Sequence, residues 1–310
     1  MSNIKCLLLS LLIGVSSTYS FSTESDHAVV KTVVNDQPFV ADFYCPNRAT
    51  KTVGVLCLGG SEGGKPDILA KFFADHGYPS LAPAYFRAQG LPDTLEAIPL
   101  EYFDRTIAWL ESNPHVAPGG IVVVGGSKGA ELALLLASRR TDIIGVVAIS
   151  PSSVVWQGLP KRFWPVPPAR SSWTSGGVPL TFVPYDHSRV FNPFDKLAVY
   201  KIYQRSLADD AATAKAKIEV EKINGPVLLY SGRSDALWPS TEMGDALCER
   251  LRANGFAHAY QHFKYADAGH TLNEHCIAGG TVEGNKRARI DTCQRMLDFL
   301  ESITVASGAH

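Results

Sequence analysis

The chain has 310 residues, of which 45% are hydrophobic and 19% are charged, values typical of a folded globular protein rather than a disordered or fibrous one. Its 29 basic and 30 acidic residues give a net charge of -1, so no broad positive field would attract nucleic acid or an anionic membrane. A chain of this length can bury a large core without metal sites or partner subunits.

Residues 1–20 have the pattern of a secretory signal peptide. A short, positively charged start precedes an apolar run over residues 6–15, and mostly small polar residues follow as far as Ser20. We therefore expect cleavage after Ser20 and export to a periplasmic or extracellular space, with a mature single domain over 21–310. The apolar run is too short to cross a bilayer, and we expect no membrane span elsewhere. A mispredicted start followed by a short apolar helix is the alternative.

Five cysteines would remain after cleavage: Cys45, Cys57, Cys248, Cys276 and Cys293. An odd number leaves at least one thiol unpaired, and no CxxC spacing indicates a zinc or redox site. In an oxidising compartment we expect one bridge, between Cys276 and Cys293 in the last segment of the chain. Cys57 lies in an apolar run and is expected to be a buried hydrophobic residue.

The predicted elements alternate along the first half of the chain. Residues 29–34 and 39–44 flank turn residues and predict an antiparallel hairpin. Apolar strands are then predicted at 53–58, 80–84, 121–124 and 143–149, and helices at 68–76, 99–112 and 128–138. Buried strands between helices are typical of a parallel sheet covered on both faces, which predicts the α/β class.

Residues 151–203 interrupt this alternation with prolines and with ten of the 30 aromatic residues, among them Trp156. Such an excursion either packs on the edge of the sheet or forms a cap over a binding site, and the two interpretations are compatible. We expect a cap. The alternation then resumes with a strand at 227–230, a helix at 240–254 that Ser240 is expected to cap, a strand at 258–265 and a closing helix at 283–304.

The pattern G-x-S-x-G occurs twice, around Ser61 and around Ser127. A nucleophilic serine of this kind needs a strand, a sharp turn and an immediate helix, so that its hydroxyl stands at the head of the helix. Ser127 meets this demand, because an apolar strand runs into it and a helix begins at once. Ser61 does not, because Gly63, Gly64, Lys65 and Pro66 intervene before the next helix.

The loop around Ser61 has a different expected role. In hydrolases of this type, the glycine-rich loop one strand ahead of the nucleophile supplies one backbone N–H to the oxyanion, and the residue after the nucleophile supplies the other. We therefore expect the oxyanion donors to be Lys128 and one of Gly60 or Ser61. The same loop nearly matches a phosphate-binding P-loop, but Pro66 replaces the hydroxyl that would hold magnesium.

An activated serine also needs a base and an orienting acid. Asp235 follows the predicted strand at 227–230, and His270 follows the strand at 258–265, so both come after Ser127 in the order Ser, Asp, His. The ends of parallel strands meet at one edge of a sheet, which favours a triad of the three. Individually, Asp235 could be a turn or helix cap and His270 a loop histidine, and Asp267 is a rival acid.

Neither a metal nor a cofactor is predicted. His258 and His262 are four apart on a predicted strand, too far apart to share a metal ion, and His275 with Cys276 lacks further ligands. Glu131, one helical turn after Ser127, is expected to pair at the surface with Lys128 or Arg139.

Several stretches resemble the catalytic domain of the acyl-CoA thioesterase and bile acid-CoA:amino acid N-acyltransferase family. They are the segment around Ser127 at 125–134, and the segments at 149–158, 236–240 and 279–281. The resemblance runs from about residue 53 to 300 and implies an α/β-hydrolase fold with a cap. It also implies that Ser127, Asp235 and His270 form the family's triad, and we expect Trp156 and Trp238 to contact substrate.

The resemblance implies hydrolysis of acyl thioesters, since the amino-acid-conjugating branch of that family uses a cysteine nucleophile where this chain has Ser127. Animal members carry a β-sandwich domain ahead of the hydrolase domain, whereas about thirty residues separate Ser20 from Val53 here. Export would also remove the protein from cytosolic CoA. Carboxylesterase activity on oxygen esters and N-acyl transfer therefore stay open. If CoA is the substrate carrier, Lys128 and the Lys161–Arg162 pair are the first cations to test.

Overall fold

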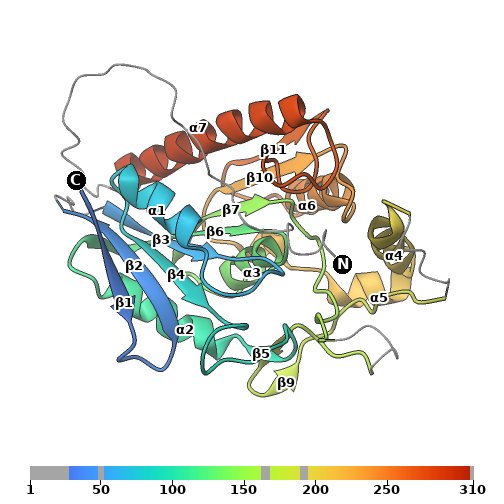
Figure 1. Ribbon diagram of the computed structural model, residues 1–310, viewed down its shortest axis with the longest axis horizontal. Coiled ribbons are helices and arrows are strands. Elements are labelled where there is room, and N and C mark those ends of the chain that lie inside the picture. The colour runs from blue at the N-terminus through green and yellow to red at the C-terminus, as the bar shows by residue number, and fades with distance from the viewer. Residues whose placement is uncertain (1–27, 48–51, 162–167, 189–194, 308–310) are drawn as a thin grey trace.

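An eight-stranded sheet forms the centre of the molecule (Figure 1). The computed structural model describes residues 28–47, 52–161, 168–188 and 195–307, and its strand order is β1-β2-β4-β3-β6-β7-β10-β11. The strands are β1 (Val29–Val34), β2 (Val40–Pro46), β3 (Thr52–Leu58), β4 (Ser80–Ala84), β6 (Val116–Gly126), β7 (Ile143–Ile149), β10 (Val227–Gly232) and β11 (Tyr260–Tyr265). Pairs β1–β2 and β2–β4 are antiparallel, and the remaining pairs, from β4 to β11, are parallel. The predicted α/β class is confirmed.

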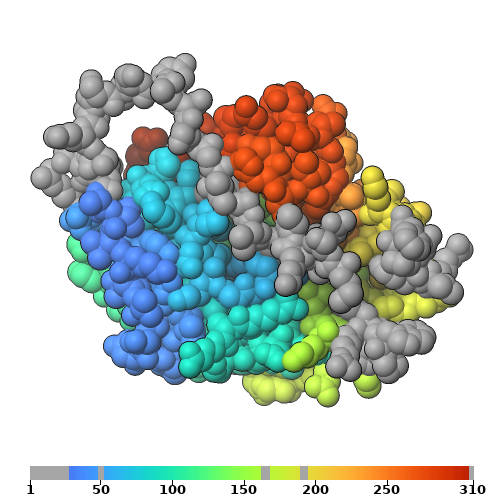
Figure 2. Space-filling view, viewed as in Figure 1, coloured from blue at the N-terminus to red at the C-terminus, as the bar shows by residue number. Residues whose placement is uncertain are grey.

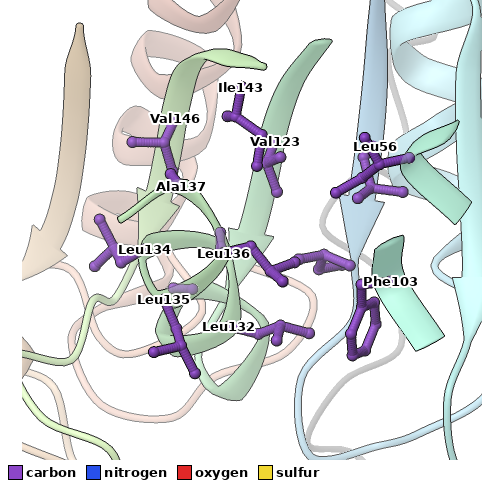
Figure 3. Close-up of a cluster of buried hydrophobic side chains, with 14 of the residues drawn as sticks. Leu56, Phe103, Val123, Leu132, Leu134, Leu135, Leu136, Ala137, Ile143 and Val146 are labelled. Atoms are coloured by element: carbon purple, nitrogen blue, oxygen red, sulfur yellow. The ribbon is translucent and has the colours of Figure 1, made fainter. Parts of the chain in front are cut away.

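Five helices cover the sheet: α1 (Asp67–Asp75), α2 (Glu101–Glu111), α3 (Lys128–Ala137), α6 (Ser240–Ala253) and α7 (Val282–Ser307). Alternate residues of β3 point to opposite faces, as the pleat requires. Val53, Val55 and Cys57 pack in one hydrophobic cluster with α1 and α7, whereas Leu56 and Leu58 pack in the other with α2, α3 and α6. Figure 3 shows part of the second cluster, in which Phe103 of α2 faces leucines of α3.

Strand β1 is one edge of the sheet and β11 is the other. The space-filling view shows the blue residues of β1 and β2 at one side of the molecule and the orange-red residues of α7 at the top (Figure 2). None of the helices in the described part of the chain is long and apolar enough to span a bilayer. The predicted signal peptide lies outside the described residues.

Two predictions about strand β6 and the cysteines need correction. Strand β6 begins at Val116 rather than at 121, because Val116 pairs with Thr52 and a shift of register then accommodates the prolyl-glycyl stretch before Ile121. Cys293 is a free thiol, so the expected bridge to Cys276 is wrong. Cys293 is packed beside the apolar cluster under α7, and burial raises the pKa of its thiol to about 11. Cys57 is fully buried, as predicted.

The segment between β7 and β10 is more ordered than an irregular excursion. Its strands β8 (Trp173–Ser175) and β9 (Val178–Pro179) form a small sheet with β5 (Ile98–Pro99). Helices α4 (Ala198–Leu207) and α5 (Asp210–Ala216), which were not predicted, and the short 3-10 helix η1 (Val220–Lys222) lead to β10. Their sequence signals are weak: α4 has apolar residues at helical spacing among charged ones, and Asp209 caps α5 by accepting the Ala212 N–H.

Candidate active site

Ser127 occupies the sharp turn between β6 and α3. Its backbone has φ +56° and ψ -121°, a left-handed conformation that costs a non-glycine residue about 1–3 kcal/mol. The turn is held by the Ser127 N–H, which donates to Ile149 O at 2.8 Å. Glycines are required beside it: a Cβ on Gly125 would lie 2.1 Å from Gly129 O, and one on Gly129 would lie 2.3 Å from Leu58 O. The strand–turn–helix geometry predicted for Ser127 is present.

Asp235 and His270 meet at the same end of the sheet. Asp235 follows β10 and His270 follows β11, and His270 Nδ1 lies 2.8 Å from Asp235 Oδ2. Both side chains are buried, at 3% and 1% exposure. The rival acid Asp267 is exposed and pairs with Arg287 instead.

The Asp235 carboxylate accepts further hydrogen bonds that hold it in place. Its Oδ1 accepts the N–H groups of Leu237 at 2.8 Å and Trp238 at 3.1 Å, and its Oδ2 accepts the Ser240 hydroxyl at 2.6 Å. The cap predicted for Ser240 is therefore wrong: α6 has Pro239 at its N-cap, and the Ser240 hydroxyl fixes the acid. Four donors around one carboxylate hold it oriented toward His270.

The far nitrogen of His270 is available. His270 Nε2 is buried and makes no hydrogen bond with any part of the chain that the structure describes. The end of β7 connects it to the serine turn, because Ile149 O accepts the Ser127 N–H and the Ser150 hydroxyl donates to His270 O. The structure thus shows a hydrogen bond between the acid and the base, and none between the base and Ser127. Such contacts often tighten only when substrate is bound.

The predicted oxyanion donors are in different states. Lys128 is the first residue of α3, where backbone N–H groups have no partner within the helix and the helix dipole favours negative charge. The Gly60 N–H is occupied, because it donates to the side chain of Glu62 at 2.9 Å. No backbone partner for the Ser61 N–H occurs among the described residues. Of the two loop candidates, Ser61 is therefore the donor that is open in this structure.

Glu62 is a residue of this site that the sequence analysis missed. Its Oε1 accepts the Gly60 N–H, whereas its Oε2 is buried and has no hydrogen-bond partner among the described residues. Burial raises the pKa of Glu62 to about 7, and backbone donors and the nearby His270 and Arg87 oppose the rise. A carboxylate within a glycine-rich loop beside the nucleophile was the available signal.

The Lys128 side chain turns away from the site. Its Nζ pairs with Glu131 and donates a hydrogen bond to Ser172 Oγ at 2.8 Å. It also lies 5.6 Å from the centre of the Trp173 ring. Glu131 Oε1 in turn accepts the Trp156 N–H at 3.2 Å and Trp173 Nε1 at 2.8 Å. Burial lowers the pKa of Lys128 and raises that of Glu131, and their attraction opposes both shifts. Glu131 pairs with Lys128 as predicted, but the pair is buried and not at the surface, so this cation is not open to an anionic substrate.

The other cations predicted for CoA give no assembled site. Lys161 is exposed and pairs with Asp93 at 2.8 Å, and Arg162 lies outside the described residues.

The two tryptophans expected to contact substrate are packed in a separate hydrophobic cluster. Trp156 is fully buried and Trp238 is 1% exposed, and the Tyr203 ring meets both edge-on at 4.8 and 5.4 Å. Trp238 also contacts the His270 ring edge-on at 5.5 Å. In this arrangement Trp238 supports the base, and contact with substrate stays a prediction for both residues.

A second Ser–His–Asp chain lies between β10, β11 and α6. Ser231 Oγ is 2.8 Å from His262 Nε2, and His262 Nδ1 is 2.9 Å from Asp245 Oδ1. The Thr241 hydroxyl donates to Ser231 Oγ at 3.0 Å. This chain uses His262 in a hydrogen-bond network, and no group of three or more side chains in the described ranges could hold a metal ion.

Comparison with known proteins identifies the family to which the chain is similar. A family model described as "BAAT / Acyl-CoA thioester hydrolase C terminal" matches residues 98–305. The chain is 27% identical over 278 residues to acyl-coenzyme A thioesterase 6 from Mus musculus, covering 84% of this chain and 62% of that protein. It is 29% identical over 276 residues to mitochondrial acyl-coenzyme A thioesterase 2 from the same species, covering 84% and 57%. The chain thus spans less than two thirds of these relatives.

A further relative is named for a different activity. Acyl-coenzyme A amino acid N-acyltransferase 1 from Mus musculus is 27% identical over 221 residues, covering 71% of this chain and 48% of that protein. Among solved structures, a Pyrococcus furiosus esterase superposes with a TM-score of 0.52 at 16% identity, covering 90% of this chain and 91% of that one. A puromycin-hydrolysing peptidase from Mycobacterium tuberculosis gives 0.58 at 12%, covering 90% and 39%. These two likenesses show the α/β-hydrolase fold.

Proposed function

Because the chain belongs to the BAAT/acyl-CoA thioester hydrolase family, we propose that it hydrolyses acyl thioesters through Ser127, His270 and Asp235. The observation that carries the proposal is the buried Asp235–His270 pair. His270 Nε2 has no hydrogen-bond partner among the described residues, and it lies at the end of the sheet where the strained Ser127 turn lies. A base held by an acid on one side and open on the other is what serine activation requires.

The reaction follows from these positions. His270 Nε2 takes the proton of Ser127 Oγ as the serine attacks the thioester carbonyl, while Asp235 keeps the imidazole in the tautomer that exposes Nε2. The N–H groups of Lys128 and Ser61 stabilise the oxyanion. Collapse breaks the carbon–sulfur bond, and His270 returns the proton to the thiolate. Water activated by His270 then attacks the acyl-serine, and the carboxylic acid leaves.

The first test is the fate of Ser127. We expect Ser127→Ala to lower kcat/KM by at least about 10⁴-fold, since removing the nucleophile of a triad costs a factor of this order or more. A fluorophosphonate should label Ser127 in the wild-type protein, with the labelled peptide identified by mass spectrometry. Ser231→Ala is the matched control, because it removes the serine of the hydrogen-bonded Ser231–His262–Asp245 group. Full activity of Ser127→Ala would refute the proposal.

The second test is the leaving group. Specificity constants for acyl-CoA and for oxygen esters with the same acyl chain compare thioesterase with esterase activity. Product analysis with added amino acids measures acyl transfer, which the N-acyltransferase relative makes worth testing. Hydrolysis of thioesters in preference to matched esters, with no amide product, is the expected result.

We also infer export of the mature protein from residues 1–20, and a cap formed by residues 151–203. The first inference rests on the sequence pattern alone. N-terminal sequencing of protein recovered from the exported fraction should begin at Phe21. A mature chain that begins at Met1 would contradict it.

A further inference from the structure

The side chain of Glu62 is not used in the reaction above, although it lies in the same site. It belongs to the loop between β3 and α1, and its two carboxyl oxygens are in different situations. Oε1 accepts the Gly60 N–H at 2.9 Å, and Oε2 is buried and finds no partner in the part of the chain that the structure describes. A buried oxygen with no donor is destabilising unless some other group supplies one.

The loop that carries Glu62 is firmly held. The Arg87 guanidinium donates to the carbonyl oxygens of Ser61 and Glu62, at 3.2 and 3.4 Å, and the Tyr85 hydroxyl donates to Gly59 O. A Cβ on Gly63 would lie 2.7 Å from the Arg87 Cβ, so loop and arginine are in close contact. These anchors fix the backbone from which the Glu62 side chain extends.

The free oxygen lies close to the nucleophile. An ideal Cβ placed on Gly60 would be 2.9 Å from Glu62 Oε2 and 3.3 Å from the Ser127 Cβ. Both groups therefore line the same small space next to Gly60. A carbonyl attacked by Ser127 Oγ would bring the atoms a few bonds away from it within hydrogen-bonding distance of Oε2.

We propose that Glu62 is a specificity-determining residue whose free Oε2 binds an O–H or N–H donor of the substrate located a few bonds from the scissile carbonyl. This inference rests on the proposed function of Ser127. The donor can come from two sources: a hydroxyl on the acyl chain, or the amide N–H of a cysteamine-type thiol leaving group. A site built to accept a hydrogen bond discriminates strongly against substrates that lack the donor, because its polar atom is then left buried and unpaired.

The experiment measures kcat/KM at pH 8, above the pKa of about 7 at which Glu62 ionises. For the acyl-side donor it compares p-nitrophenyl 3-hydroxybutyrate with p-nitrophenyl butyrate. For the leaving-group donor it compares the butyryl thioester of N-acetylcysteamine with that of butanethiol. We expect the wild type to prefer the donor-bearing substrate at least about tenfold in one of the two comparisons.

Glu62→Gln should abolish that preference, because the amide keeps an acceptor for Gly60 and presents N–H groups where Oε2 stood. The control is Glu249→Gln, which removes an exposed carboxylate from α6 and should leave the ratio unchanged. No preference in either wild-type comparison, or a preference that survives Glu62→Gln, would overturn the inference. Failure of the proposed function is a separate result: Ser127→Ala would then stay active on all four substrates.

Discussion

The molecule has two groups of Ser, His and Asp side chains. The group in which hydrogen bonds join all three side chains is not the one we propose for catalysis. Ser231, His262 and Asp245 form a continuous chain with contacts of 2.8 and 2.9 Å. In the other chain His270 bonds to Asp235, but its Nε2 has no partner among the described residues. In the Ser231 group both histidine nitrogens already have hydrogen-bond partners, so none is left for a reaction with substrate. His270 Nε2 is still available.

The backbone makes the same distinction. Ser231 lies within the regular strand β10 and is fully buried, and Thr241 of α6 donates to its hydroxyl. Ser127 has a left-handed backbone at the head of α3, next to N–H groups that lack helical partners. Strain and unsatisfied donors cost stability and persist where the surrounding structure enforces them. Side-chain hydrogen bonds alone therefore do not identify a nucleophile.

The largest effect should separate the two acids. We expect Asp235→Asn to lower kcat about 10⁴-fold, because the amide stabilises the wrong tautomer of His270. Asp245→Asn should change kcat less than about threefold, since Asp245 is half exposed and pairs with His262 and Lys264 rather than with His270. Steady-state kinetics on a thioester measure both. Similar losses of kcat in the two variants would contradict the assignment of Asp235 as the acid of the triad.

The buried pair beneath the serine turn should control stability. Lys128→Met leaves the Glu131 carboxylate buried without its cation, which costs about 3–5 kcal/mol of unfolding free energy. Urea denaturation measures the loss. The double variant Lys128→Met, Glu131→Leu should recover part of it, because no unpaired charge is left. A single variant as stable as wild type would show that the pair does not support the turn.

The smallest effect concerns the loop after His270 and depends on pH. Arg289 of α7 donates two hydrogen bonds to Glu274 and lowers the pKa of that carboxyl from 4.5 to about 2. The pair therefore stabilises the fold above about pH 4.5 and loses this contribution as the pH falls toward 2. The difference in urea midpoint between wild type and Glu274→Gln should shrink over that range. A difference independent of pH would contradict the assignment.

The sheet and the order of the candidate triad can be predicted from the amino-acid sequence alone. Continuous apolar runs specified β3 and β7 because strands buried on both faces have no polar side. Gly125 and Gly129 specified the turn at Ser127, since their Cβ positions are blocked by backbone atoms. Asp235 and His270 followed from their places after consecutive parallel strands.

Which polar groups have hydrogen-bond partners depends on tertiary contacts. Lys128 is adjacent to the nucleophile in sequence, yet its ammonium is buried against Ser172 and Trp173, more than forty residues away. The Ser240 hydroxyl holds Asp235 instead of capping its helix, and Glu62 has one oxygen bonded and one free. Local patterns fix the backbone through periodicity and steric limits, whereas burial and hydrogen-bond partners depend on contacts between distant segments.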